Sequence, residues 1–108
     1  TIKAKISLHA VYRPELELII LAWDSRDLSQ EDSNDGAYIC LYRKIEGEEY
    51  FRFMETLKIN ERSTYDRRVP EGKSAEYEMR IITRSGKRSE YSNRTKATVP
   101  AKPAETNN

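Results

Sequence analysis

Few side chains in this sequence are suited to act as a nucleophile or a general base, and those few are far apart. There is one histidine, His9, and one cysteine, Cys40. A nucleophilic cysteine needs a base within hydrogen-bond reach, but Cys40 alternates with Tyr38 and Tyr42 on one face of an apolar segment. Free cysteine is among the most buried residue types, so we expect Cys40 to pack in the core and His9 to be exposed at a strand end. The sequence therefore predicts no enzymatic activity.

Carboxylates gather in segment 24–36, where they suggest a calcium site, since this cation prefers several oxygen ligands. The acids concerned are Asp24, Asp27, Glu31, Asp32 and Asp35. Aligning Gly36 with the glycine of a calcium-binding loop, however, leaves Tyr42 where the closing Glu belongs. Acids on an open loop also lack the pocket that glycoside hydrolysis requires. We interpret the segment as a long, solvated, acidic loop and expect no metal and no other cofactor.

The triplet Asn93, Arg94 and Thr95 matches the acceptor pattern for N-glycosylation. The pattern matters only in a eukaryotic secretory pathway, and a three-residue motif arises easily by chance. The triplet therefore marks Asn93 as an acceptor pattern and does not by itself establish a glycan.

The chain around these residues is patterned as a series of β-strands. Residues 2–8 alternate strictly between apolar and polar, and residues 16–23 are almost continuously apolar, which indicates two strands. Ile19, Leu21 and Trp23 share one face of the second, so Trp23 is predicted to lie in the core. Further strands are predicted over 38–43, 50–54, 63–69 with Tyr65 as its anchor, 77–82 and 91–99, with turns at 46–48, 70–72 and 85–86. This pattern predicts an all-β, immunoglobulin-like sandwich of about seven antiparallel strands.

Length and composition limit the classes of protein to which the chain can belong. Its 108 residues accommodate one domain, which we place at 1–99, followed by a linker-like tail at 100–108. A net charge of +1 lacks the basic excess of a nucleic-acid-binding domain. No run approaches the roughly 20 apolar residues of a membrane helix, so no membrane insertion is expected. A single cysteine forms no internal disulfide, and a start without methionine indicates a module cut from a longer chain.

Several short motifs follow one another in the order of a known family. They are Trp23 at a strand end, the alternation Tyr38, Cys40, Tyr42 followed by Arg43, the group Tyr65, Asp66, Val69 and Gly72, the alternation Tyr77, Met79, Ile81, and the turn segment 86–93. From about Leu16 to Val99 the sequence thus resembles a fibronectin type III domain, in the style of large bacterial surface proteins. The resemblance implies the fibronectin type III topology and an extracellular or cell-surface location. It also identifies Tyr77 with the corner tyrosine of the family, although segment 69–77 is about two residues longer than we expect for that family.

Two functions fit a strand-rich domain without catalytic residues. The first is a non-catalytic interaction or spacer module of a larger cell-surface or secreted protein, which is monomeric when isolated and contacts neighbouring domains or another protein. The alternative is a carbohydrate-binding accessory module of a polysaccharide-degrading enzyme, because sugar sites use exposed aromatic faces. Its candidate platform residues are Tyr12, Tyr50, Phe51 and Tyr91.

If Trp23 faces the core, the alternation of strands also predicts where a partner docks. We expect one sheet to carry a mixed apolar and cationic outer face, suited to an anionic or amphipathic partner. Its residues are Ile39, Leu41, Arg43, Arg80, Ile82 and Arg84. The acidic loop 24–36 is the rival site, but a preordered sheet loses less entropy on binding than a flexible loop.

Overall fold

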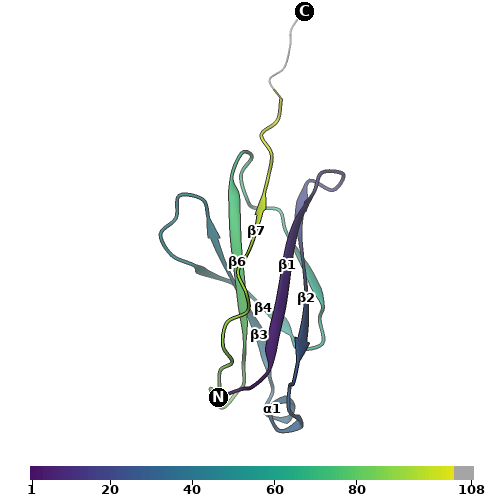
Figure 1. The fold of residues 1–108 in the computed structure, drawn as a ribbon, viewed down its shortest axis with the longest axis vertical. Coiled ribbons are helices and arrows are strands. Elements are labelled where there is room, and N and C mark those ends of the chain that lie inside the picture. Colours follow the sequence, from purple (N-terminus) through teal and green to yellow (C-terminus); the bar gives the residue numbers. More distant parts are fainter. Residues whose placement is uncertain (104–108) are drawn as a thin grey trace, which may run out of the picture.

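Antiparallel pairing of short strands builds the fold of residues 1–103, the part of the chain that the computed structural model describes (Figure 1). The elements are β1 (Lys5–Arg13), β2 (Leu18–Arg26), α1 (Gln30–Asn34), β3 (Tyr38–Ile45), β4 (Arg52–Lys58), β5 (Ser63–Asp66), β6 (Ser74–Ile82) and β7 (Thr95–Thr98). One sheet has the strand order β1-β2-β5 and the other β4-β3-β6-β7. The prediction of an all-β, immunoglobulin-like sandwich is confirmed.

The core fills the space between the inner faces of the two sheets. Alternate residues at the start of the chain are buried, as the period of two predicted; they are Ile2, Ala4, Ile6, Leu8 and Ala10. On β2 the side chains of Ile19 and Leu21 are fully buried, and Trp23 is 4% exposed. Trp23 is therefore a core residue, as predicted.

The inner and outer faces of β3 are the reverse of those predicted. Ile39 and Leu41 are fully buried in the core, because they pair with the inward residues Ile81 and Met79 of β6. The prediction that Ile39 and Leu41 face outward was wrong. Cys40 is buried as predicted, but it lies on the outer face of the sheet and not within the core cluster. Both faces of β3 carry large side chains, so its alternation alone does not say which face is inside.

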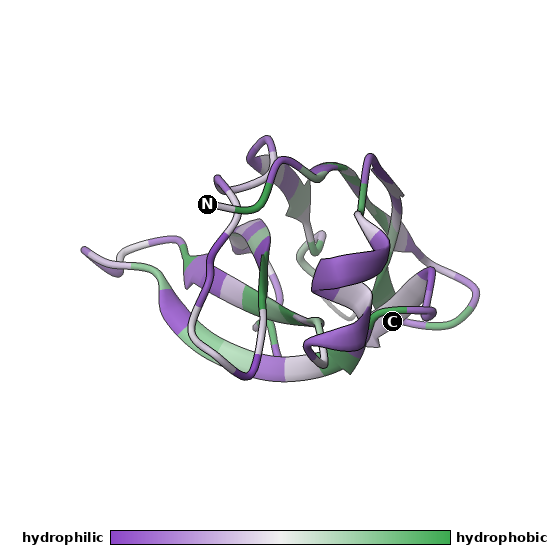
Figure 2. Ribbon diagram, turned by 90° about the horizontal axis from the view of Figure 1, so that it is seen from below, coloured by the Kyte–Doolittle hydropathy of each residue, from purple (hydrophilic) through white to green (hydrophobic). Residues whose placement is uncertain are grey.

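The segment predicted to be a long irregular loop is partly regular. β2 continues to Arg26, and α1 occupies residues 30–34, so this prediction was wrong for much of the segment. The hydroxyl of Ser29 caps the helix by accepting a hydrogen bond from the backbone N–H of Asp32, at 3.1 Å. Figure 2 views the sandwich from the end that carries α1 and shows the helix as hydrophilic.

Two strands in the middle of the chain also differ from the prediction. β4 lies at Arg52–Lys58, further along than the predicted 50–54. On β5 the side chain of Tyr65 points to solvent and is 59% exposed, whereas the adjacent Asp66 is buried. Tyr65 is therefore not the core anchor of its strand, and a carboxylate takes the inward position.

Two side chains from the segment after β6 form hydrogen bonds with the backbone at the edge of β1. The amide of Asn93 accepts a hydrogen bond from Leu8 N and donates one to Leu8 O, both at 2.8 Å. The hydroxyl of Thr95 accepts from Ala10 N at 3.1 Å. Pairing of the strand edge in this way discourages association with other chains, and a glycan on Asn93 would compete with the contact to Leu8.

The two ends of the described chain lie at opposite ends of the sandwich. The N-terminus lies beside α1, and β7 leads away towards the other end (Figure 1). Of the predicted tail 100–108, the start stays close to the domain, since Lys102 forms an ion pair with Glu71 at 3.4 Å; residues 104–108 lie outside the described part. Within residues 1–103 there is no helix with the length and apolar character needed to cross a membrane.

Candidate interaction face

Four side chains on the outer surface of the four-stranded sheet form a continuous group, which we call the aromatic-arginine cluster: Tyr42, Phe53, Arg80 and Tyr91. The rings of Tyr42 and Phe53 meet edge to face, with centroids 6.0 Å apart, and those of Tyr42 and Tyr91 do so at 5.7 Å. The guanidinium of Arg80 lies over the ring of Tyr91, 4.5 Å from its centroid. Edge-to-face pairs and cation-π contacts both stabilise such a group.

Strand register brings three members of the cluster together. Tyr42 of β3 pairs with Phe53 of β4, and Cys40, two residues earlier on the same face, pairs with Arg80 of β6. A register shift between Leu41 and Tyr42 is needed for the first of these pairs, because it leaves one residue of β4 without a partner. Side chains distant in sequence thereby share one surface.

The fourth member, Tyr91, is held by the serines on either side of it. Ser89 and Ser92 accept hydrogen bonds from the backbone N–H groups of Ile81 and Met79 through their hydroxyls, at 2.8 and 3.0 Å. Their own backbone N–H groups donate to the carbonyls of the same two residues, at 2.9 and 2.7 Å. Segment 89–92 is thus fastened along β6, and the position of Tyr91 is fixed before any partner arrives.

The cluster is accessible although its base is partly buried. Phe53 is 56% exposed and Tyr91 45% exposed, while Tyr42 and Arg80 are half-buried. Burial is the main cause that raises the pKa of the Tyr42 hydroxyl, and nearby Arg80 works against it. Burial likewise raises the pKa of the Cys40 thiol beside them. Tyr42 and Cys40 are accordingly neutral near pH 7.

Arg43, which we predicted to belong to the partner face, is instead part of a polar network inside the sandwich. Its guanidinium lies 2.9 Å from a carboxylate oxygen of Asp66, whose side chain is fully buried. The Tyr77 hydroxyl donates to the same carboxylate at 2.7 Å, and the backbone N–H of Arg68 donates to its other oxygen at 3.0 Å. Burial, and then the hydrogen bond to Asp66, raise the pKa of Tyr77 strongly. The network joins the two sheets, so the role of Arg43 is structural.

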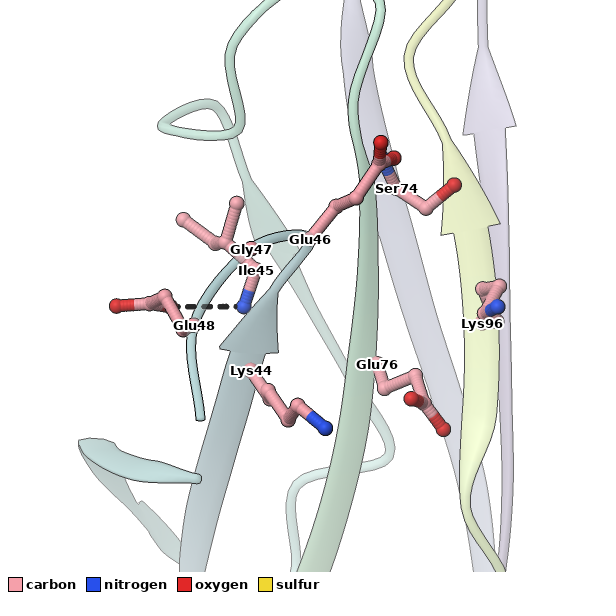
Figure 3. Close-up of a pocket in the computed structure, with 8 residues that line it drawn as sticks. All are labelled: Lys44, Ile45, Glu46, Gly47, Glu48, Ser74, Glu76 and Lys96. Carbon is pink, nitrogen blue, oxygen red and sulfur yellow. Dashed lines mark hydrogen bonds between the residues drawn. The ribbon is translucent and has the colours of Figure 1, made fainter. Parts of the chain in front are cut away.

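A shallow hollow lies on the same sheet, next to the turn between β3 and β4 (Figure 3). Its volume is about 270 Å³, and its walls include Lys44, Glu76 and Lys96, which pair across β3, β6 and β7. Two further acids there are engaged with the backbone, because Glu48 accepts from Ile45 N at 2.8 Å and Glu46 from Ser74 N at 3.0 Å. The hollow therefore offers the two lysines Lys44 and Lys96 and the carboxylate of Glu76, which accepts no such hydrogen bond from the backbone.

The other sheet carries a separate apolar patch on its outer face. Val11, Ile20 and Tyr65 pair in one row across β1, β2 and β5, and Leu16 extends the patch. The guanidinium of Arg67 lies 5.3 Å from the centroid of the Tyr65 ring. Tyr65 and Arg67 thus repeat, on the opposite side of the domain, the type of pair that Tyr91 and Arg80 form.

The structure places three of the six predicted partner residues on the outside of the sandwich and three on the inside. Arg80 and Ile82 do lie on the outer face, and Arg84 is exposed just beyond β6, where its backbone N–H donates to Asp35 O at 2.9 Å. Ile39, Leu41 and Arg43 face inward and belong to the core or the buried network. Sequence reasoning missed Tyr42 and Phe53 as surface residues; the register with Arg80 is the signal that identifies them.

The aromatic residues proposed for sugar binding are scattered. Tyr91 lies in the aromatic-arginine cluster, and Phe51 lies beneath the guanidinium of Arg94, at 4.6 Å. Tyr50 is 75% exposed, and Tyr12 is partly buried against the core of the sandwich. Within residues 1–103, no three histidine, cysteine or acidic side chains come together as a possible metal-binding group.

Comparison with known proteins places the fold. No family model matches the sequence, and no curated protein matches it. Among solved structures, pectate lyase PelI from Erwinia chrysanthemi in complex with tetragalacturonic acid superimposes on 85% of this chain, with a TM-score of 0.67 and 16% identity, and this chain spans only 28% of that one. A Fn3-like protein from Clostridium thermocellum gives a TM-score of 0.62 at 15% identity, covering 91% of this chain and 93% of that one. A myokine gives 0.56 at 13% identity, covering 92% and 94%. These likenesses show that the chain has a fibronectin type III-like fold.

Proposed function

We propose that this chain is a non-catalytic fibronectin type III-like interaction module of a larger cell-surface or secreted protein, and that it binds its partner through the aromatic-arginine cluster. The observation that supports this most is a group of three aromatic rings and an arginine that is both exposed and fixed in place. Tyrosine, phenylalanine and arginine are enriched at protein interfaces. A rigid surface also loses little entropy when it binds.

The position of the cluster suits a module within a string of domains. The described chain enters at one end of the sandwich and leaves β7 towards the other (Figure 1). Domains attached at both ends would leave the outer face of the sheet uncovered. The same geometry suits a spacer, which differs from an interaction module only in having no use for this face.

The rival site, the acidic segment 24–36, is less suited to a partner because several of its acids already have partners. Lys87 lies 3.2 Å from Glu31 and 3.4 Å from Asp32, and Ser85 donates a hydrogen bond to Asp35. A ligand would have to compete with these contacts. We therefore favour the sheet face.

The alternative function is a carbohydrate-binding accessory module of a polysaccharide-degrading enzyme. Exposed rings such as Phe53 and Tyr91 offer apolar surfaces to sugars. The same fold also forms part of a pectate lyase whose structure was solved in complex with tetragalacturonic acid. Affinity electrophoresis in gels that contain a panel of glycans tests this function, and unchanged mobility in all of them counts against it.

The parent gene provides a direct test of the module. We expect it to encode at least one further domain beside residues 1–108, whereas a reading frame that begins near Thr1 and stops near Asn108 would refute the proposal. The binding face is tested by adding the other, non-adjoining domains of the parent protein to the isotope-labelled module. We expect NMR shift changes at Phe53 and Tyr91 and none at Tyr65; changes confined to Tyr65 would refute the choice of face.

A further inference from the structure

Arg80 is a cation without a carboxylate partner. Its guanidinium is stacked on Tyr91, and within residues 1–103 it forms no ion pair, while its Nε is buried without a hydrogen-bond acceptor. Two other arginines of the sheet do have such partners, since Arg43 pairs with Asp66 and Arg94 with Glu78 at 3.2 Å. Arg80 is therefore the arginine of this face whose charge is left for a ligand.

The acids nearest to Arg80 along the strand are already engaged or lie further away. Glu78, two residues earlier on β6, is only 8% exposed and is paired with Arg94. Across the strand, Arg80 faces Cys40, which is neutral near pH 7. A planar guanidinium held in one orientation favours a carboxylate, because it can donate two parallel hydrogen bonds to the two oxygens.

We propose that the aromatic-arginine cluster binds an acidic polysaccharide built of uronic acid residues. In this arrangement, which rests on the alternative function of a carbohydrate-binding module, Arg80 pairs with a uronate carboxylate. The apolar face of a sugar ring packs on Phe53 or Tyr91. A uronate carries its carboxylate on the rigid ring itself, so one residue can satisfy the charge and the aromatic surface together. An acidic peptide carries its carboxylates on flexible side chains and would lose more entropy in reaching the same contacts.

Two lysines of the same face lie further along the strands, in the hollow next to the turn between β3 and β4. Register places Lys44 opposite Glu76, four residues along from the Cys40 and Arg80 pair, which corresponds to about 13 Å along the strands. Lys44 and Lys96 flank Glu76 in the hollow of Figure 3. The hollow also contains the acids Glu46 and Glu48, so its three carboxylates outnumber its two lysines. The carboxylate of the ligand is therefore assigned to Arg80 alone.

The test is calorimetric titration of the protein with alginate oligosaccharides, whose rings all carry a carboxylate, in a low-salt buffer that contains EDTA. We expect binding to alginate and none to its propylene glycol ester, which keeps the rings and removes the charge. Replacing Arg80 by Gln or Tyr91 by Ala should weaken binding by about tenfold or more. The matched variants Arg67→Gln and Tyr65→Ala, which change the equivalent pair on the other sheet, should bind as the wild type does. Thermal unfolding of each variant verifies that it is folded.

Three results would overturn the inference. Folded wild-type protein that shows no alginate binding does so directly. Equal weakening of alginate binding by Arg80→Gln and Arg67→Gln does so as well, because it shows that alginate is attracted to positive charge anywhere on the domain. Binding of poly-glutamate as strong as that of alginate, and equally dependent on Arg80, would identify an acidic protein as the partner. The first and third results leave the interaction module intact, since the NMR test with the other domains of the parent protein is independent of alginate.

Discussion

Replacement of Asp66 by Ala is the perturbation that tests most directly what joins the two sheets. The Asp66 carboxylate accepts hydrogen bonds from three groups, namely the Arg43 guanidinium of β3, the Tyr77 hydroxyl of β6 and the backbone N–H of Arg68. The substitution removes the acceptor and leaves all three donors in place. Because Asp66 belongs to the other sheet, the loss falls at the junction of the sandwich.

The expected cost follows from the burial of the abandoned groups. Removal of one member of a buried ion pair costs about 3–5 kcal/mol, because the remaining charge is left without compensation. The side chain of Arg43 is 20% exposed and can partly hydrate, which moves the cost towards the lower limit. Tyr77 is fully buried, so its hydroxyl adds a stranded donor that costs about 1–3 kcal/mol. These two effects act in opposite directions, so we expect a cost within the range of about 3–5 kcal/mol. This is a large share of the roughly 5–15 kcal/mol that stabilise such a domain.

Equilibrium unfolding in urea measures this cost. With a slope of about 2 kcal/mol per molar urea, the midpoint should fall by roughly 2 M. Tyr77→Phe removes a single hydroxyl and should cost only about 1–2 kcal/mol, and Asp24→Ala, at an exposed position of β2, should stay within about 0.5 kcal/mol of the wild type. A value for Asp66→Ala below about 1 kcal/mol would refute the reasoning, since it would mean that the network contributes no more than an exposed ion pair.

Three further predictions concern other parts of the chain. Trp23→Ala should cost about 3–5 kcal/mol in the same assay, and acrylamide should quench the wild-type indole only after unfolding, because Trp23 is 4% exposed. Cys40 should react with a thiol reagent at neutral pH only in urea, since it is buried and burial raises its pKa; rapid reaction of the native protein would contradict this. Hydrogen bonds, first from Ser85, hold the pKa of Asp35 below its ordinary value. Its stabilising effect is therefore complete above the ordinary aspartate pKa and is lost as pH falls through the folded-state pKa, so the advantage of the wild type over Asp35→Asn should shrink in acid; a difference independent of pH would contradict it.

The strands with one polar and one apolar face could be predicted from the sequence. In β1 the alternation states directly which residues are buried, and in β2 the face that contains Ile19, Leu21 and Trp23 is the inner one. In β3, by contrast, Ile39 and Leu41 alternate with Cys40 and Tyr42, and residues of both sets are common in protein cores. The decision between them depends on pairing with β6, which is a property of two segments and not of one.

A buried polar group explains why the orientation of β5 was predicted wrongly. On β5 the local pattern favours an inward Tyr65 and an outward Asp66, since charge is costly to bury alone. The structure has the opposite orientation because Arg43 and Tyr77, from two other strands, supply the partners. No window of sequence around Asp66 contains that information.

The orientation of β3 also determines what kind of partner the domain can bind. With Ile39 and Leu41 outward, the sheet would present aliphatic side chains and a free Arg43. With Tyr42 outward, it presents aromatic rings, and Arg43 is held in the interior by Asp66. Arg80 then becomes an arginine of this face without an ion pair, stacked on a ring whose position is fixed by two serines. The cationic charge expected from Arg80 is thus retained, but its setting changes from an aliphatic surface to an aromatic one. A rigid ligand with a fixed carboxylate is the better complement to that surface.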